Sequence, residues 1–216
     1  MTLRDTPLGP GPEFDAIREM LRRWGPQASG IGDDQLLGGL DGENYPASWA
    51  KDGSVLVWTF AGASPGVTRL TPSNDAAEPW LSGGASQAAL SRDNRWALYV
   101  SPESGRVEVY IADYPAHKFR TQVSIAGGSA PRWRADGREA FYASRDNKLM
   151  AVEITPRGNA VDVAEAKPLF DVRPVSRGLF YAPAPDGERF LVNALRDPGT
   201  AAALTLVQNW HAALQP

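Results

Sequence analysis

Short apolar segments alternate with turns rich in glycine, proline and aspartate along most of this chain. Four apolar segments, rich in β-branched and aromatic residues, each follow an Asp-Gly or Asp-Asn pair: 55–60, 96–100, 140–143 and 190–193. Asp-Gly between apolar segments is a strong hairpin signal, because glycine adopts the positive φ that a tight turn requires. The pattern therefore predicts an all-β chain in which each pair joins two antiparallel strands.

These turns belong to a motif that recurs along the chain. Its aspartates, Asp52, Asp93, Asp136 and Asp186, are 41, 43 and 50 residues apart. That spacing is close to the roughly 40–50 residues of a four-stranded propeller blade. We therefore expect four blades, as repeats near 44–82, 86–126, 129–172 and 179–210. Third strands are expected at 67–70, 107–111, 149–154 and 203–207, and fourth strands at 78–82, 121–125 and 168–172. The last repeat has no fourth strand.

The first part of the chain is unlike the repeats. Residues 1–34 are predicted to form an N-terminal extension with a short amphipathic helix over 12–24, where apolar residues recur every three or four positions before Gly25-Pro26. We interpret this helix as packing against the β-structure. A propeller segment then covers 35–216, and its first residues, 35–40, are predicted to form an outer strand that could close a ring beside 203–207.

Composition and charge exclude several functions. The net charge is −3 and no lysine or arginine stripe stands out, so the chain lacks the basic footprint of a nucleic-acid binder. It has no cysteine, which excludes disulfides and cysteine zinc sites. The longest apolar run, 201–207, is far shorter than the about 20 residues that span a bilayer. We therefore expect no membrane insertion by this chain, and no signal peptide is recognisable in it.

Several motifs, taken in order, resemble those of a known family. The segment 91–110, SRDNRWALYVSPESGRVEVY, is similar to the family elements Ser-Pro-Asp-Gly-Arg-Trp, Tyr-Val-Ser, Glu-Ser-Gly-Arg and Glu-Val-Tyr. Further matches are 127–133, 148–152, 168–170, 189–193 and 209–210. Over roughly 44–211 the chain resembles TolB-like (WD40-like) six-bladed β-propellers, particularly those in the C-terminal sensor part of bacterial eukaryotic-type serine/threonine kinases. It departs from the pattern at Asn94, Leu90 and Pro183.

The resemblance implies a partial propeller, with about four blades of a six-bladed ring. It implies a non-catalytic sensing or interaction module that binds a protein, peptide or small ligand through loops at one end of the blades, in the bacterial periplasm or another extracytoplasmic compartment. The alternative is a substrate-filtering propeller segment of a prolyl-oligopeptidase-like hydrolase. No kinase signature occurs in the sequence. An arc of blades that does not close into a ring is also expected to self-associate through its open blade edges.

Candidate catalytic groups do not form a recognisable site. The segment 62–66, GASPG, matches the Gly-x-Ser-x-Gly elbow around Ser64, but Pro65 lacks the N–H that an oxyanion hole would use. Only two histidines occur, His117 and His211, which is too few for a paired-histidine metal motif. Gly30 to Gly32 lacks a dinucleotide fingerprint, and Asp33-Asp34 lacks the oxygen spacing of a calcium loop.

The repeated aspartates and tryptophans are interpreted as structural residues, not as parts of a catalytic or binding site. An aspartate in a hairpin turn commonly accepts a hydrogen bond from the backbone two residues on, which explains all four repeat positions. The tryptophans are interpreted mostly as packing between blades; they are Trp49, Trp58, Trp80, Trp96, Trp133 and Trp210. We therefore expect no enzyme activity, no catalytic residue, no cofactor and no metal site, and the sequence does not identify the ligand-binding residues.

Overall fold

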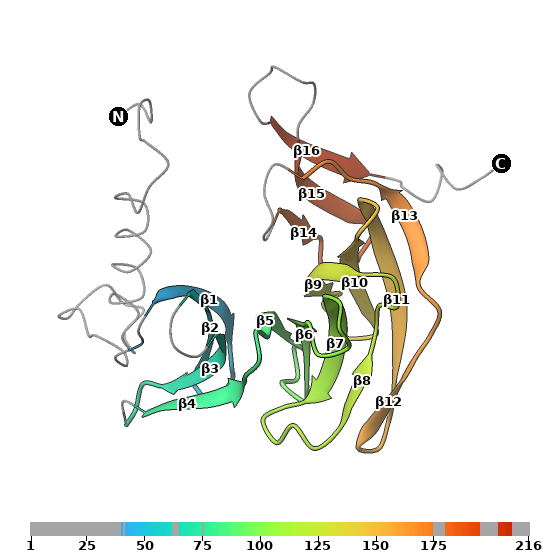
Figure 1. The fold of residues 1–216 in the computed structure, drawn as a ribbon. Helices are drawn as coiled ribbons and strands as arrows, with labels where there is room; N and C mark the ends of the chain where they lie inside the picture. The colour runs from blue at the N-terminus through green and yellow to red at the C-terminus, as the bar shows by residue number, and fades with distance from the viewer. Residues whose placement is uncertain are drawn as a thin grey trace, which may run out of the picture. The chain divides into compact units, whose positions relative to one another are not determined.

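The computed structural model describes residues 40, 42–61, 65–74, 76–174, 180–194 and 203–208. Within them the regular structure is entirely β-strand, with sixteen strands (Figure 1). The expected helix at 12–24 and the expected strand at 35–40, apart from Leu40, lie outside the described residues. The chain divides into two compact units, one ending at Ser82 and the other beginning at Gly83, and each is described by itself.

The first unit contains one antiparallel sheet whose strands follow one another in chain order. Its strands are β1 (Glu43–Trp49), β2 (Val55–Ala61), β3 (Gly66–Thr71) and β4 (Ala76–Leu81). Val55, Val57 and Leu70 form a small buried cluster in it, and Leu40 packs against this cluster. The sheet confirms the strands predicted at 55–60, 67–70 and 78–82.

The second unit contains three antiparallel sheets built on the same plan. The first sheet consists of β5 (Ser86–Leu90), β6 (Trp96–Ser101), β7 (Glu108–Asp113) and β8 (Arg120–Gln122). The second consists of β9 (Gly128–Trp133), β10 (Glu139–Ser144), β11 (Lys148–Arg157), β12 (Ala160–Val163) and β13 (Lys167–Asp171). The third consists of β14 (Tyr181–Pro183), β15 (Arg189–Ala194) and β16 (Ala203–Gln208). Within the described residues this third sheet has three strands, and the positions after β16, where a fourth strand would follow, lie outside them.

The second sheet holds one strand that the sequence pattern missed. β11 continues beyond Ile154 to Arg157, turns at Gly158 with φ +63°, and returns as β12. β12 pairs with the second half of β11, whereas β13 pairs with its first half. The turn residues Gly158-Asn159 and the alternating Val161 and Val163 were the available signal for this hairpin.

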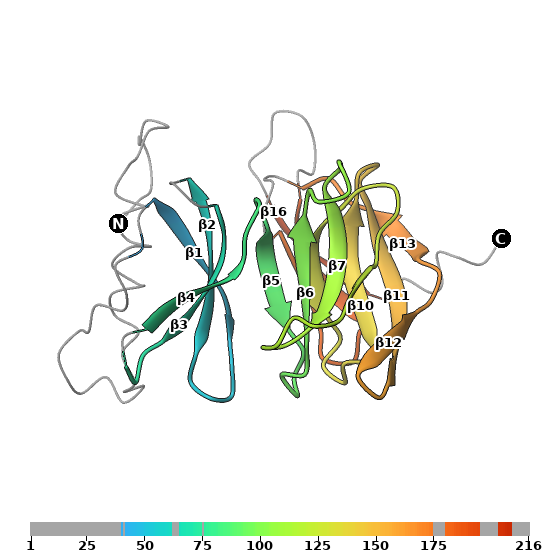
Figure 2. The same cartoon turned by 60° about the horizontal axis from the view of Figure 1, so that its bottom comes forward.

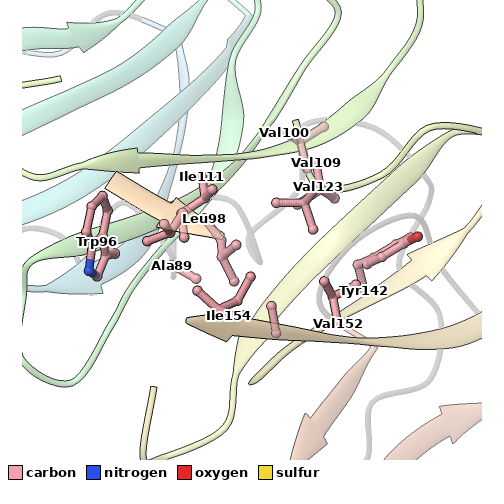
Figure 3. Close-up of a cluster of buried hydrophobic side chains, with 12 residues drawn as sticks. Ala89, Trp96, Leu98, Val100, Val109, Ile111, Val123, Tyr142, Val152 and Ile154 are labelled. Carbon is pink, nitrogen blue, oxygen red and sulfur yellow. The ribbon is translucent and has the colours of Figure 1, made fainter. Parts of the chain in front are cut away.

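Apolar side chains fill the spaces between neighbouring sheets of the second unit. One buried cluster joins side chains of β5, β6 and β7 to those of β10, β11 and β12 (Figure 3). Another joins the second sheet to the third and includes Phe141, Phe190 and Tyr181. Each sheet thus covers the apolar face of the next, as blades of a propeller do.

Hydrogen bonds between the first strands of these sheets add to the packing. The Gln87 side-chain oxygen accepts the Ala130 N–H at 2.6 Å, and the Tyr181 hydroxyl donates to the Ala130 carbonyl at 2.8 Å. The Trp133 indole N–H donates to the Ala89 carbonyl at 2.9 Å. β5, β9 and β14 are therefore held together by polar as well as apolar contacts.

Candidate functional site

The four repeat aspartates have the structural role that the sequence predicted. In each, a carboxylate oxygen accepts the backbone N–H two residues on, at 2.9 to 3.1 Å, in the pairs Asp52 with Ser54, Asp93 with Arg95, Asp136 with Arg138, and Asp186 with Glu188. The Arg134 guanidinium bonded to Asp136 lowers the pKa of that carboxyl. Carboxylates committed to a turn in this way are poor candidates for acid–base chemistry.

Asn94, which replaces the glycine of the repeat turn, adopts the conformation that glycine would have. Its φ is +61°, against +83° and +73° at the corresponding Gly53 and Gly137. Asparagine tolerates this left-handed region better than most residues. The departure at Asn94 therefore leaves the turn intact.

The Gly-x-Ser-x-Gly match lies in a hairpin connection. β2 ends at Ala61 and β3 begins at Gly66, and the two strands pair antiparallel. A nucleophile elbow needs a strand followed by a helix, so the flanking structure does not provide that context. Ser64 itself lies outside the described residues.

The candidate metal ligands are not brought together where the structure describes them. His117 lies in the β7–β8 loop, with its Nε2 3.5 Å from the Tyr99 hydroxyl, and burial lowers its pKa. His211, Asp33, Asp34 and the glycines 30 and 32 lie outside the described residues. In the part of the chain that is described, no three histidine, cysteine, aspartate or glutamate side chains form a group that could hold a metal.

The tryptophans divide between packing and exposure. Trp96 and Trp133 belong to the cluster between the first two sheets of the second unit, as the inter-blade interpretation predicted. Trp58 instead stacks on Tyr45 within its own sheet, with ring centroids 4.5 Å apart. Trp49 is 49% exposed, so burial does not explain this residue. Trp210 lies outside the described residues.

Glu108 is a fully buried acid that the sequence did not single out. Its carboxylate accepts the Gly127 N–H at 2.9 Å, the Arg106 Nε–H at 2.9 Å and the Ser124 hydroxyl. These donors come from the segments before β7 and after β8, so the carboxylate joins the two. Because its oxygens already accept several hydrogen bonds, Glu108 has a structural role.

A hollow at one end of the second unit is the best candidate for a binding site. Its volume is about 460 Å³, and it lies between the first sheet and the β11–β12 turn of the second. We call it the turn-end hollow; it is lined by Arg95, Trp96, Asp113, Tyr114, Lys118, Phe119 and Asn159. The β5–β6 and β11–β12 turns lie at the same end of their sheets (Figure 2). Loops at one end of the blades are where the resemblance predicted binding.

Local hydrogen bonds shape the wall of the turn-end hollow that follows β7. The Asp113 carboxylate accepts the Phe119 N–H at 2.5 Å, and the Asp113 N–H donates to the Phe119 carbonyl at 3.2 Å. The Tyr114 N–H donates to the Arg95 carbonyl at 2.9 Å, which ties this loop to the β5–β6 turn. The loop that follows β7 is thus held at both ends, at Asp113 and Tyr114 and again at Phe119.

The opposite wall is joined to the first sheet by Arg95. One Nη of its guanidinium donates to the Gly158 carbonyl at 2.9 Å, across 63 positions of sequence. The guanidinium carbon also lies 5.9 Å from the centre of the Trp96 ring, within the range of a cation–π contact. Arg95 therefore connects the two turns that border the hollow.

Trp96 has one polar group without a partner. The side chain is 3% exposed and contacts Phe119 edge to face, with ring centroids 5.9 Å apart. Its indole N–H makes no hydrogen bond within the described residues. An unpaired buried donor costs about 1–3 kcal/mol.

Comparisons with known proteins concern the fold. No protein-family profile and no curated protein sequence matches the chain. Solved structures match it, among them TolB from Acinetobacter baumannii, 13% identical with a TM-score of 0.63, over 85% of this chain and 45% of that one. An oligogalacturonate lyase in complex with manganese is 15% identical with a TM-score of 0.55, over 81% of this chain and 49% of the lyase. A puromycin-hydrolyzing peptidase from Mycobacterium tuberculosis is 15% identical with a TM-score of 0.53, over 80% and 31%.

These likenesses extend to the architecture and not to the whole of the other proteins. This chain spans less than half the length of each of the three. Among the residues that the structure places, none forms a helix with the length and apolar character needed to cross a membrane. Together with the sequential antiparallel sheets, the matches show that the chain has an all-β fold of the β-propeller type.

Proposed function

We propose that this chain is a non-catalytic β-propeller module that binds a protein, peptide or small ligand through the turn-end hollow. The observation that carries the proposal is the composition of the hollow. It combines two exposed cationic side chains, Arg95 and Lys118, with aromatic walls. A concave site with a few convergent polar groups among apolar ones is the usual form of a ligand site.

The state of the acids supports a binding role over a catalytic one. In the hollow, the Asp113 carboxylate already accepts the Phe119 N–H. Outside it, Glu108 and the repeat aspartates accept hydrogen bonds from their own turns or loops. A general acid or base must instead be placed to exchange a proton with a substrate.

The cellular setting is proposed from the resemblance in sequence. The motifs in 91–110 resemble the propellers of bacterial serine/threonine kinases and TolB-like envelope systems, and the likeness in fold to TolB of Acinetobacter baumannii agrees with this group. We therefore infer a sensing or interaction module associated with such a kinase or envelope system, in an extracytoplasmic compartment.

A second candidate is a propeller that filters substrates for a hydrolase. The likeness in fold to the puromycin-hydrolyzing peptidase supports it, because a propeller can belong to an enzyme without holding the reacting groups. In that setting the turn-end hollow would contact a peptide substrate, and the chemistry would take place in another domain.

Two measurements on the purified chain test the binding role. The first is an assay with ester, peptide and ATP substrates, in which no turnover is expected; activity that disappears in Ser64→Ala would overturn the proposal. The second records ¹⁵N–¹H spectra with a panel of neutral, cationic and anionic fragments and short peptides. At least one class should shift the resonances of 95–96 and 113–119, and a panel that leaves all of them unchanged would contradict a site in the hollow.

A further inference from the structure

We propose that the turn-end hollow recognises a single carboxylate attached to an apolar body. This inference rests on the proposed binding function and names the class of ligand. The carboxylate could belong to a small organic acid or to the C-terminus of a peptide, since both present the same group.

The charges that line the hollow favour an anion with one negative charge. Arg95 and Lys118 contribute two positive charges, and Asp113 contributes one negative charge, so the lining has a net charge of +1. Neither cation forms an ion pair with a carboxylate in the described part of the chain. A ligand with one negative charge would therefore bring the total charge of the lining and the ligand to zero.

Arg95 is placed to bind a carboxylate. Within the described residues its guanidinium makes one hydrogen bond, from an Nη to the Gly158 carbonyl, which holds the group at the border of the hollow. The Nε–H and the other Nη make no hydrogen bond within the described residues. A guanidinium edge presents parallel donors that match the two oxygens of a carboxylate.

Trp96 supplies apolar lining and a spectroscopic probe of the site. Its ring lines the hollow, and Figure 3 shows it at one edge of the buried cluster. Its indole N–H is buried and has no partner within the described residues, so its resonance is not masked by an existing hydrogen bond.

The aromatic side chains of the hollow favour a ligand whose carboxylate is attached to an apolar group. Phe119 meets Trp96 edge to face at 5.9 Å, and Tyr114 adds a third ring to the lining. Because the Asp113 carboxylate and N–H both bond the Phe119 backbone and hold that segment, a ligand gains contact with these rings at little ordering cost. A carboxylate without an apolar part would forgo this contact.

The test titrates the full chain with a matched pair of small molecules, N-acetyl-L-phenylalanine and its amide, followed by ¹⁵N–¹H spectra. The two probes differ only in the carboxylate. The acid should shift the Trp96 indole N–H resonance, assigned through Trp96→Phe, and bind at least tenfold more tightly than the amide. Arg95→Gln should weaken binding of the acid about tenfold, a loss of about 1.4 kcal/mol. Arg92→Gln, in the same β5–β6 turn but outside the hollow, should leave it unchanged.

A second pair of probes separates the two sources of the carboxylate. An octapeptide that ends in phenylalanine is compared with its C-terminally amidated form. Preference for the free-acid peptide supports a chain terminus as ligand, and binding of the small acid alone supports an organic acid. If acid and amide forms bind equally, or neither shifts the Trp96 resonance, the inference is wrong. The proposed binding function then still stands if neutral or cationic members of the fragment panel shift the resonances of 95–96 and 113–119.

Discussion

Replacing Trp133 tests whether the sheets of the second unit depend on contacts across their interface. The side chain lies on β9, packs against the cluster between the first two sheets, and donates its indole N–H to the Ala89 carbonyl of β5 at 2.9 Å. Truncation of a buried tryptophan to alanine costs about 3–5 kcal/mol. Because Trp133 is only partly buried, we expect Trp133→Ala to lower the free energy of unfolding by about 3 kcal/mol, with the lost hydrogen bond contributing about 1 kcal/mol of it.

The assay is a urea titration followed by far-UV circular dichroism, with the transition of the second unit fitted separately. Trp133→Phe is the matched control, since it retains most of the apolar contact and loses the N–H, and it should cost about 1 kcal/mol. The slopes of the transitions must agree for the free energies to be compared. A loss below about 1 kcal/mol for Trp133→Ala would refute the packing role and leave Trp133 as a surface residue.

Three further predictions concern stability and assembly. Glu108→Gln should lower the free energy of unfolding by about 2 kcal/mol in the same titration, because the NH₂ of the amide would face N–H and O–H groups that now donate to the carboxylate. The control Glu103→Gln, which removes a partly exposed ion pair, should cost less than about 1 kcal/mol. Since the pKa of Asp136 is lowered in the folded chain, the stability it contributes is present above its usual pKa and is lost as the pH falls toward the folded value; thermal melts between pH 5 and 3 should therefore show a steeper decline for the wild type than for Asp136→Asn, and equal declines would contradict this. Gel filtration with light scattering should show dimers or larger species if open blade edges associate, and a stable monomer near 23 kDa would rule that out.

The strands and their turns were predictable because their causes are local. An Asp-Gly pair determines a tight turn through the φ of the glycine and the carboxylate of the aspartate, and Gly53 with Asp52 shows both effects. Alternating β-branched and aromatic residues then predict the strands on either side. Where hairpins join successive strands, as in the first unit, strand order could be predicted too; in the second sheet it could not, because β13 pairs with β11 and not with β12.

The site needed contacts that are distant in sequence. Arg95 and Gly158 are separated by 63 positions, and the hairpin that carries Gly158 was missed because the long β11 has no apolar alternation beyond Ile154. Likewise, nothing near Glu108 in the sequence indicates that its oxygens accept hydrogen bonds from Ser124 and Gly127.

By itself, the sequence determined an all-β chain of repeated antiparallel sheets and excluded the motifs of several enzyme classes. Only the tertiary structure decided which side chains share a cavity, that the Glu108 carboxylate is already bonded, and which donor is left unpaired at Trp96. The reason is physical: turn and strand preferences depend on neighbours along the chain, whereas a binding site depends on the packing of one sheet against the next, which brings together residues that the repeat pattern does not relate.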